Sequence, residues 1–374
     1  MKAIVAVTND IVTDRRILKT CSALNECGYK PKIIGRRLFN SLSTKDLPYE
    51  TYRFVLLFNK KAFFYAEYNI RLFFLLLFSK FDLIVSNDLD TLPACFLAAK
   101  IKRKKIIYDS HEYFCYTPEL ISRPKIQKIW LSIEKYFVPK IKTAITVNSS
   151  IAEIYKKQYN VDFKVIRNIP ALDKYYLFIR NPKPRKMIGI PENKKMVILQ
   201  GAGININRGA EELIESFQFI DDAVLFIIGS GDVFEKLKQM RKTLKLEEKV
   251  FILDKMPFSQ LVHFTSNADI GISIDKATNP NYQYSLPNKI FDYIQIGVPV
   301  LASNLVEIDK IYAQFDIGLK IENHEPKHIA EQLNKMIHAN GQVKTWKNNL
   351  KKAAEEYNWA NEREKLVEII RNAY

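Results

Sequence analysis

The chain has 374 residues, of which 47% are hydrophobic and 26% are charged. This length accommodates two domains, and the composition excludes a disordered chain. The formal net charge is +16, and residues 1–170 hold 29 Lys and Arg against 15 Asp and Glu, whereas the rest of the chain holds 28 against 26. The first half is therefore expected to meet an anionic partner, which is nucleic acid, an acidic membrane surface or a phosphorylated acceptor.

The apolar runs of the sequence are short. The first residues, MKAIVAVTND, contain too short a run for a secretion signal and predict a β-strand. The most apolar segment, LFFLLLF at residues 72–78, is far shorter than the roughly 20 residues of a membrane span. The four cysteines show no CxxC spacing. We expect a cytoplasmic protein with reduced thiols and no transmembrane helix.

Short β-branched runs alternate with longer amphipathic segments throughout residues 1–168. The helical pattern covers residues 13–28, 61–79, 90–103 and 124–140, and a further helix follows a capping box formed by Ser150 and Glu153. Strands are predicted between these helices. This alternation predicts a parallel sheet with helices on both faces, and we assign residues 1–168 to an N-terminal Rossmann-like domain.

The same alternation restarts after a polar, proline-bearing stretch at residues 171–195. We assign residues 169–359 to a second Rossmann-like domain, and we expect a helix at residues 360–374 to pack back on the first. The predicted fold class is α/β, with two doubly wound parallel-sheet domains facing across a cleft. Ligands bind at the carboxyl ends of the strands in such sheets.

The glycine-bearing segment GAGININRG, residues 201–209, follows a predicted strand and opens a helix. Backbone N–H groups at Gly201 and Gly203, the helix dipole and the Arg208 side chain can together hold a phosphate. A tight turn without a ligand is the alternative interpretation. Ile206 stands where a dinucleotide fingerprint needs its third glycine, so NAD binding is not predicted.

Two other patterns are interpreted as structural. GSGD at residues 229–232 predicts a tight strand-to-helix turn with Asp232 as the N-cap. HEPKH at residues 324–328 fits the HExxH pattern, but Pro326 is expected at the first helical position, which leaves His324 outside the helix. No metal site is therefore predicted.

Polar side chains follow two predicted strands of the first half. IIYDSHEY carries His111 and Glu112 after a strand, and a histidine there can donate to a substrate hydroxyl near neutral pH. The alternative is a loop histidine bonded to local backbone. TNDIVTDRR follows the first strand and adds four candidates for the cleft. The alternative is that the acids mark a helix start and the arginines are solvated. These four are Asp10, Asp14, Arg15 and Arg16.

The segment YSLPNKIFDYIQIGVPVLAS, residues 284–303, predicts a helix with Ser285 as its N-cap, followed by a buried strand. Lys289 and Asp292 share one face of this helix, close to its positively polarised start. Taken alone, these two residues predict a surface ion pair.

Basic and aromatic residues are interleaved at residues 100–105 and 125–142, where Trp130, Tyr136 and Phe137 occur among lysines. No helix-turn-helix, RNP or zinc-finger pattern accompanies them, so nucleic acid binding is not predicted. An amphipathic basic face on an anionic membrane is one interpretation, and a solvated face is the other.

Four segments, TNDIVTDRRILKTCSALNECGYK, YDSHEY, NRGAEELIESF and YSLPNKIFDYIQIGVPVLAS, together resemble bacterial glycosyltransferases of the family 4 type, which have the GT-B fold. The resemblance covers essentially the whole chain. It implies transfer of a sugar from a nucleotide-diphosphate sugar to a glycan or lipid-linked acceptor in cell-surface polysaccharide synthesis. It also implies retention of the anomeric configuration, no metal and no other cofactor, with the acceptor in the first domain and the donor in the second.

The resemblance assigns roles to residues of the second domain. Asp292 matches the second glutamate of the family's Glu-x7-Glu motif, which holds the donor ribose, and Tyr284 takes the place of the first. Arg208 matches the lysine of the family's diphosphate pair. Ala202 or Gly203 stands where the arginine of that pair belongs.

We expect Lys289 to supply the missing positive charge on the diphosphate. His111 matches the family's loop histidine near the donor sugar, while residues 8–10 replace its glycine-rich first loop and leave the acceptor contacts open. The candidates are thus, for catalysis, His111, Arg208 and Lys289 and, for donor binding, Gly201, Gly203, Arg208, Ser285, Lys289 and Asp292. Two alternatives stay open, which are a nucleotide-sugar epimerase of the same fold and a catalytically silent subunit that binds a nucleotide sugar or glycan.

Overall fold

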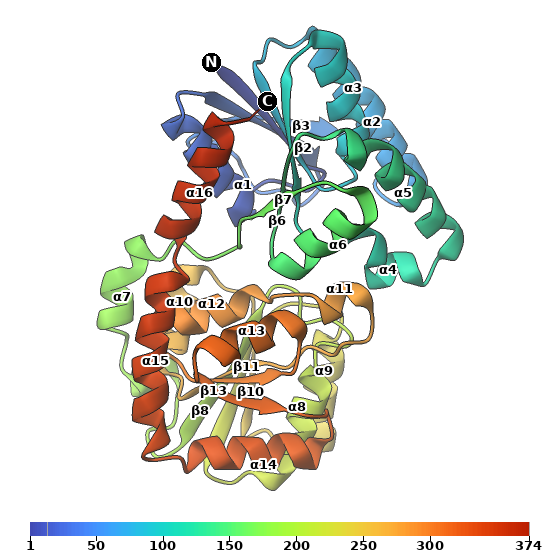
Figure 1. Cartoon of the computed structure of the whole chain (residues 1–374). Helices are drawn as coiled ribbons and strands as arrows, with labels where there is room; N and C mark the ends of the chain where they lie inside the picture. Colours follow the sequence, from blue (N-terminus) through green and yellow to red (C-terminus); the bar gives the residue numbers. More distant parts are fainter. Residues whose placement is uncertain (13, 374) are drawn as a thin grey trace. The chain divides into compact units, whose positions relative to one another are not determined.

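The computed structural model describes residues 1–12 and 14–373, and these form two compact units (Figure 1). The first unit contains the chain up to Asn168, the short segment Asn279–Asn281 and the C-terminal helix from Ala360. The second unit contains Ile169–Thr278 and Tyr282–Trp359. Each unit is a parallel sheet with helices on both faces, so the predicted fold class is confirmed.

The sheet of the first unit has seven strands in the order β3-β2-β1-β4-β5-β6-β7, and all neighbours are parallel. The strands are β1 (Lys2–Ala6), β2 (Lys30–Arg37), β3 (Glu50–Val55), β4 (Leu83–Asn87), β5 (Lys105–Ser110), β6 (Thr143–Thr146) and β7 (Phe163–Val165). The order changes direction beside β1, which lies between β2 and β4. Ligands of doubly wound sheets bind at such a switch point, outside the carboxyl ends of the strands.

The helices of the first unit are α1 (Arg15–Glu26), α2 (Lys61–Phe78), α3 (Leu92–Lys102), α4 (Pro118–Ile121), α5 (Pro124–Phe137), α6 (Ser149–Tyr159) and α16 (Trp359–Arg371), with short 3-10 turns η1 (Phe114–Tyr116) and η2 (Val138–Lys140). These helices are positioned by apolar faces that pack against the sheet. In α2, for example, Phe64, Tyr68, Leu72 and Leu76 recur every four residues and are buried against the sheet.

The second unit has six parallel strands in the order β10-β9-β8-β11-β12-β13. These are β8 (Lys195–Gly201), β9 (Ala223–Gly229), β10 (Val250–Asp254), β11 (Ile270–Ser273), β12 (Val300–Ser303) and β13 (Gly318–Ile321). Its helices are α7 (Tyr176–Arg180), α8 (Ala210–Ser216), α9 (Phe234–Thr243), α10 (Phe258–Asn267), α11 (Pro280–Gln283), α12 (Asn288–Ile296), α13 (Val306–Gln314), α14 (Pro326–Ile337) and α15 (Gln342–Glu356), with 3-10 turns η3 (Asp173–Tyr175), η4 (Arg185–Ile188) and η5 (Phe217–Phe219). The start of α14 at Pro326 agrees with the sequence prediction.

Three predicted helix caps are wrong. The N-cap of α6 is Asn148, whose side chain accepts from Ile151 N, and not the predicted Ser150 box. The N-cap of α12 is Pro287, because Ser285 Oγ instead donates to Tyr282 O at 2.9 Å. The N-cap of α9 is Val233, because the Asp232 carboxylate accepts from Ile206 N at 3.0 Å. Ser285 and Asp232 thus use their side chains in other hydrogen bonds, and Asn148 caps α6 ahead of Ser150.

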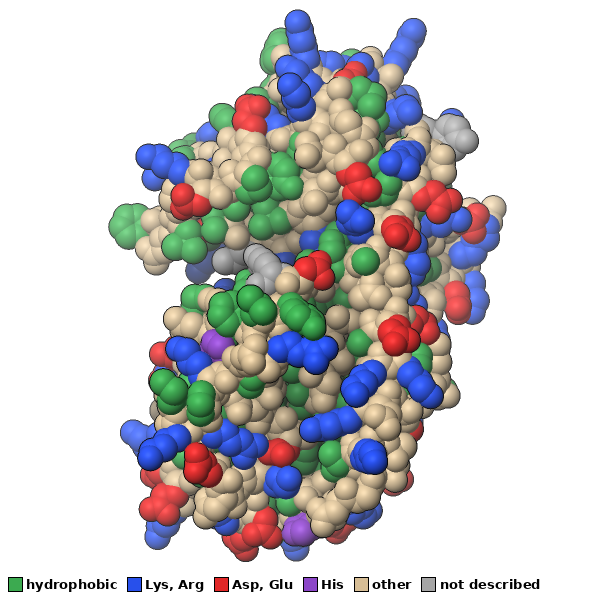
Figure 2. Space-filling view, turned by 90° about the vertical axis from the view of Figure 1, so that its left-hand side faces the viewer, with side chains coloured by type: hydrophobic (Ala, Val, Ile, Leu, Met, Phe, Trp, Pro, Cys, Tyr) green, Lys and Arg blue, Asp and Glu red, His purple; other side chains and the backbone are tan. Residues whose placement is uncertain are grey.

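Apolar side chains are exposed in several places on the first unit, among them Phe39, Leu57 and Phe78. Figure 2 shows one face of the molecule, on which apolar side chains gather in patches between Lys and Arg side chains. Among the helices of residues 1–12 and 14–373, none is both long and apolar enough to cross a membrane.

Candidate functional site

The loop between β8 and α8 is a tight turn that packs on the loop after β9. Ile204 N donates to Ser230 O at 2.9 Å, and Ser230 N donates to Gly201 O at 3.1 Å. A Cβ atom at Gly231 would lie 1.9 Å from Ile204 O, so only glycine fits there. The glycine pair at residues 229–231 therefore serves the close approach of the two loops.

Several backbone donors of this loop are already used within the protein. Ile206 N donates to Asp232 Oδ1 at 3.0 Å, and Arg208 N donates to Asn205 O at 3.1 Å. Helix α8 has only seven residues, which limits the dipole at its start. The backbone cradle expected at Gly201 and Gly203 is therefore smaller than the sequence suggests, and an anion here depends mainly on side chains.

Two cationic side chains meet beside this loop, around one buried carboxylate. Arg208 Nη1 lies 2.6 Å from Asp275 Oδ2, and Lys289 Nζ lies 3.7 Å from Asp275 Oδ1. The guanidinium of Arg208 also stacks over the ring of Tyr282 at 4.2 Å from the centroid. The structure thus brings together Arg208 and Lys289, which are 81 positions apart in the printed sequence. Asp275 follows β11, and the sequence interpretation missed it.

The cluster of Arg208, Lys289 and Asp275 has a surplus of positive charge. The Asp275 side chain is fully buried, and its Oδ1 atom has no hydrogen-bond partner. Burial lowers the pKa of Lys289, although Asp275 opposes this shift. Burial also disfavours the charged form of Arg208, but Asp275 outweighs it and raises the pKa of that group. Two partly buried cations with one buried anion between them favour an anionic ligand.

Asp292 and Lys289 do not form the surface ion pair that their spacing suggests. The Lys289 side chain is only 11% exposed and points to Asp275. Asp292 Oδ2 instead accepts from Gln200 Nε2 at 3.0 Å, and Gln200 Oε1 accepts from Thr265 Oγ1 at 2.6 Å. Asp292 is therefore positioned by the end of β8, which leaves it beside the loop that carries Arg208.

In the first unit, the strand end of β5 carries a buried ion pair. Arg16 of α1 donates to both carboxylate oxygens of Asp109, from Nε at 2.9 Å and from Nη2 at 2.6 Å, and its Nη1 donates to Ile166 O. Arg16 and Asp109 are both buried. Burial raises the pKa of Asp109, but Arg16 and His111 outweigh it and hold that pKa below its usual range. Arg16, predicted as a cleft residue, holds α1 against the sheet.

His111 follows Asp109 and lies between two carboxylates. Its Nδ1 is 3.2 Å from Asp88 Oδ2, and its Nε2 is 3.1 Å from Asn87 Oδ1 and 3.5 Å from Asp109 Oδ2. Burial favours the neutral ring, but Asp88 and Asp109 outweigh it and raise the pKa of His111 to about 9. The imidazole is therefore charged at neutral pH, and its side chain keeps 21% of its surface exposed. Its two ring N–H groups already face Asp88 on one side and Asn87 and Asp109 on the other, so a ligand at this edge would share one of these donors.

Two further acids lie at the same edge of the first sheet. Burial and repulsion from Asp88 raise the pKa values of Asp90 and Glu112 to about 7. Asp90 Oδ2 accepts from Thr8 Oγ1 at 2.6 Å, and Glu112 Oε2 accepts from Asn281 Nδ2 at 2.9 Å. The sequence interpretation missed Asp88 and Asp90. The signal was available, because DLD follows the strand at residues 83–87 just as HEY follows the next one.

The other predicted cleft residues have structural partners. Asp14 is the N-cap of α1 and accepts from Arg16 N, Ile17 N and Asn9 Nδ2. Asp10 forms an ion pair with Arg53 at 2.7 Å. Arg15 is exposed on α1. The alternative interpretation of helix-start acids therefore describes Asp14 better than a cleft role does.

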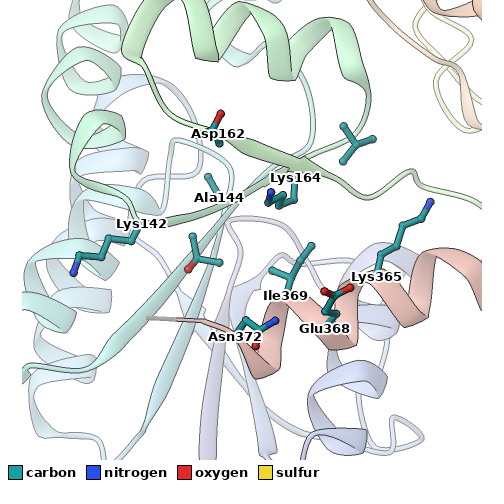
Figure 3. A pocket seen from close by; sticks show the side chains of 10 residues that line it. Lys142, Ala144, Asp162, Lys164, Lys365, Glu368, Ile369 and Asn372 are labelled. Carbon is teal, nitrogen blue, oxygen red and sulfur yellow. The ribbon is translucent and has the colours of Figure 1, made fainter.

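A pocket of about 400 Å³ lies elsewhere in the first unit (Figure 3). Lys142 and Thr143 at the start of β6, Lys164 of β7, and Glu368 and Asn372 of α16 are among its lining residues. It therefore opens at the opposite end of the strands from His111, away from the edge where ligands of such sheets bind. Within the described part of the chain, no three His, Cys, Asp or Glu side chains form a metal-binding group.

Two family descriptions match the chain. Residues 13–171 match "Glycosyltransferase Family 4", and residues 181–353 match "Glycosyl transferases group 1". Together they cover residues 13–353 except for residues 172–180. A curated relative, an uncharacterized glycosyltransferase of Methanocaldococcus jannaschii, is 25% identical over 163 residues, which are 42% of this chain and 37% of that protein. The match thus spans well under half of the relative's length.

Solved structures share the fold over nearly the whole chain. Sucrose-phosphate synthase from Thermosynechococcus elongatus has a TM-score of 0.81 at 14% identity, covering 99% of this chain and 98% of its own. Anabaena HepE in complex with UDP and glucose has a TM-score of 0.77 at 17% identity, covering 100% of both chains. WaaG, a glycosyltransferase involved in lipopolysaccharide biosynthesis, has a TM-score of 0.74 at 14% identity, also covering 100% of both chains. Sequence identities this low show that the chains share a fold, and they show nothing more.

Proposed function

The chain belongs to the glycosyltransferases of family 4 and group 1, and from this premise we propose that it transfers a sugar from a nucleoside-diphosphate sugar to a glycan or lipid-linked acceptor. The observation that carries this proposal is the cluster of Arg208 and Lys289 around Asp275. We further propose that the transfer retains the anomeric configuration, needs no metal and serves cell-surface polysaccharide synthesis.

The cation cluster suits the diphosphate of a sugar donor. The electrostatic problem of glycosyl transfer is the negative charge that develops on the departing diphosphate, and fixed cations in a buried site stabilise that charge. Arg208 and Lys289 supply two such cations, and Asp275 holds them in place before the donor arrives. Asp292 would accept the ribose hydroxyls, since its carboxylate is positioned by Gln200 beside the same loop.

We propose that His111 donates a hydrogen bond to a hydroxyl of the donor sugar. Its ring is charged near neutral pH because two carboxylates flank it, and a charged donor makes a stronger hydrogen bond than a neutral one. The same flanking acids fix the ring, so His111 is oriented before the substrate binds.

The test is a thermal-shift screen of UDP, ADP, GDP and CDP, followed by a turnover assay with the sugar of the stabilising base. UDP comes first because the HepE structures contain UDP and UDP-glucose. A nucleotide at 100 times its dissociation constant stabilises the folded protein by about 2.7 kcal/mol. The absence of stabilisation by every nucleoside diphosphate would contradict the proposal. Free epimerised sugar formed without acceptor would instead indicate a nucleotide-sugar epimerase.

Metal independence is tested in the same assay. Turnover should be unchanged by EDTA, because Arg208 and Lys289 take the place of a divalent ion on the diphosphate. Loss of turnover with EDTA and its return with Mg²⁺ or Mn²⁺ would show that the cations of the chain are insufficient.

We also propose a cytoplasmic location with peripheral attachment to the inner face of the cell membrane. The support is the charge of the first half of the chain, where Lys and Arg outnumber Asp and Glu by 29 to 15 over residues 1–170. Basic residues near an anionic leaflet contribute on the order of 1 kcal/mol each. Such attachment would present the first unit to a lipid-linked or membrane-proximal acceptor.

A further inference from the structure

Helix α2 has an apolar face on each side. Four apolar residues of α2 are buried against the sheet, as described above, and a second set on the opposite side is exposed to solvent. These exposed residues are Phe63 at 69%, Ile70 at 59%, Phe74 at 53% and Phe78 at 86%. The ion pair of Glu67 and Arg71 lies among these residues on the same side of the helix. Four large exposed apolar side chains on one side of a surface helix indicate an interaction surface.

The neighbouring helix α3 also carries exposed apolar side chains. The two helices are adjacent, because Ala94 N of α3 donates to Asn69 Oδ1 of α2 at 3.2 Å and both helices contribute to one core cluster (Figure 1). Leu97 and Ile101 of α3 are exposed. We call Phe63, Ile70, Phe74, Phe78, Leu97 and Ile101 together the α2–α3 face. From Phe63 to Phe78 it follows roughly 22 Å of helix, at about 1.5 Å per residue.

Positive charges border this face. Helix α2 carries Lys61 and Arg71, and α3 carries Lys100 and Lys102, whereas Glu67 is the single acid within these two helices, both of which are fully described. Glu67 is paired with Arg71 at 2.7 Å and is mostly covered. The border therefore attracts anionic groups, and it disfavours a second copy of the same face, which would bring like charges together.

We propose that the α2–α3 face inserts its apolar side chains into the interface of an anionic lipid bilayer, with α2 lying parallel to the membrane plane. An apolar stripe flanked by Lys and Arg is the pattern of interfacial helices, which bury their apolar side among the headgroups and first acyl carbons. Lys61 and Lys100 meet the anionic headgroups while Phe74 and Phe78 enter the apolar layer. This inference rests on the proposed membrane-proximal acceptor and is independent of the donor chemistry.

This assignment replaces the membrane face predicted from sequence in α5. Of the three aromatic residues interleaved with lysines there, Trp130 and Phe137 are buried in the protein, and only Tyr136 is exposed. Trp130 packs against the rings of Tyr65 and Phe114 instead. The cations of α5 are available to a membrane, but two of its three aromatics are not.

The experiment is flotation of the full chain with vesicles of phosphatidylcholine alone or mixed with phosphatidylglycerol, at low and high salt. Wild type should bind the anionic vesicles and keep part of this binding at high salt, because screening weakens the charge contacts and leaves apolar insertion intact. The double variant Phe74→Gln, Phe78→Gln should lower the partition coefficient by roughly tenfold or more and lose the salt-resistant part.

A matched control uses equally exposed apolar residues of the second unit. The double variant Leu177→Gln, Met187→Gln removes side chains that are 72% and 74% exposed and should float like wild type. A charge variant, Lys61→Gln with Lys100→Gln, should weaken binding only at low salt. Circular dichroism and thermal shift with a nucleoside diphosphate show that each variant is folded, and they report on the donor site separately.

Three outcomes overturn the inference. Wild type that ignores anionic vesicles at low salt excludes a bilayer partner. Equal flotation of wild type and the Phe74, Phe78 variant would place the membrane contact elsewhere. A dimeric wild type and a monomeric variant by light scattering, without vesicle binding, would make the α2–α3 face an interface between two copies. Nucleotide stabilisation is unaffected in each case, so the proposed function is tested apart from this inference.

Discussion

The charged clusters at the carboxyl ends of the two sheets have opposite charge balances. At the first sheet, four carboxylates surround two basic side chains, and these are Asp88, Asp90, Asp109 and Glu112 around Arg16 and His111. At the second sheet, two cations share one carboxylate, and these are Arg208 and Lys289 around Asp275. The two units have the same type of sheet, so the charge comes from the loops and not from the architecture.

The difference indicates which chemistry each unit supports. A cation-rich edge stabilises the diphosphate of a donor, whereas an acid-rich edge around a histidine holds a proton and polar hydroxyl groups. The buried acids of the first unit also repel one another, which is why the pKa values of Asp90 and Glu112 rise to about 7. In such proteins a few loop residues determine the chemistry of the site, while the fold only positions them.

The largest expected effect comes from removing one cation of the second unit. Arg208→Ala and Lys289→Ala should each lower the turnover number by roughly a hundredfold, or about 2.7 kcal/mol, because the leaving diphosphate loses a fixed positive charge. Lys335→Ala, an exposed lysine of α14 in the same unit, is the control and should leave turnover unchanged. Full activity of either site variant would show that the cation-rich edge serves only structure.

Asp292→Ala should weaken nucleoside-diphosphate binding by roughly 1.5 to 3 kcal/mol, the scale of a hydrogen bond to a charged group. The fold should survive, because the side chain is one of several polar groups at the end of β8. Isothermal titration calorimetry with the nucleotide identified by thermal shift measures the effect. The control is Glu331→Ala on the exposed side of α14. An unchanged dissociation constant would show that Asp292 does not contact the bound nucleotide.

The pH dependence of stability should distinguish the acid-rich edge. The folded pKa of His111 is about 9, above its unfolded value of 6.5. The stability it contributes is therefore complete below pH 6.5 and is lost as the pH rises through 9. His111→Gln should flatten this loss. The full pKa difference corresponds to about 3.4 kcal/mol, and solvent screening of the partly exposed ring should reduce the loss to about 2 kcal/mol.

Urea unfolding at several pH values between 6 and 10 measures this loss. His338→Gln, an exposed histidine of the second unit, should keep the wild-type slope. Burial lowers the pKa of Lys289 below its unfolded value of 10.5, so in the second unit the corresponding effect has the opposite sign, and stability rises as the pH passes the lowered pKa. A wild-type stability that is flat from pH 6.5 to 9 would contradict the charged state of His111.

The smallest expected effect comes from removing the buried carboxylate of the second unit. Asp275→Asn removes the only negative charge of the Arg208, Lys289 and Asp275 cluster, so a nucleoside diphosphate should bind roughly tenfold more tightly while product release slows. The melting temperature should fall, because two partly buried cations then lack their counter-charge.

A matched control for Asp275→Asn exists in the same unit. Asp269 also lies between two cations, at 2.6 Å from Arg185 and 3.3 Å from Lys195, and it precedes β11 at the amino ends of the strands, whereas the glycine loop follows the carboxyl end of β8. Asp269→Asn should lower stability without changing nucleotide affinity. Tighter nucleotide binding by both variants would mean that net charge, rather than the position of Asp275, sets the affinity.

The elements of the chain could be predicted from the sequence because they depend on local periodicity. Apolar residues every three or four positions gave α2, and Pro326 marked the start of α14, since both signals act within a few residues. The family resemblance, built on four such segments, is confirmed by the two family matches. The helix caps were less predictable, because a cap depends on which polar partner lies nearest in space.

The tertiary structure alone decided how the charges are grouped. Arg16 binds Asp109 across 93 positions, and Arg208 binds Asp275 across 67, and no local pattern specifies either pair. The physical reason is that parallel strands bring their carboxyl ends to one edge, where loops distant in sequence share a low-dielectric site. The sequence by itself determined which charged residues follow the strands, and only the folded sheets decided which of them neutralise one another and which keep a charge for a ligand.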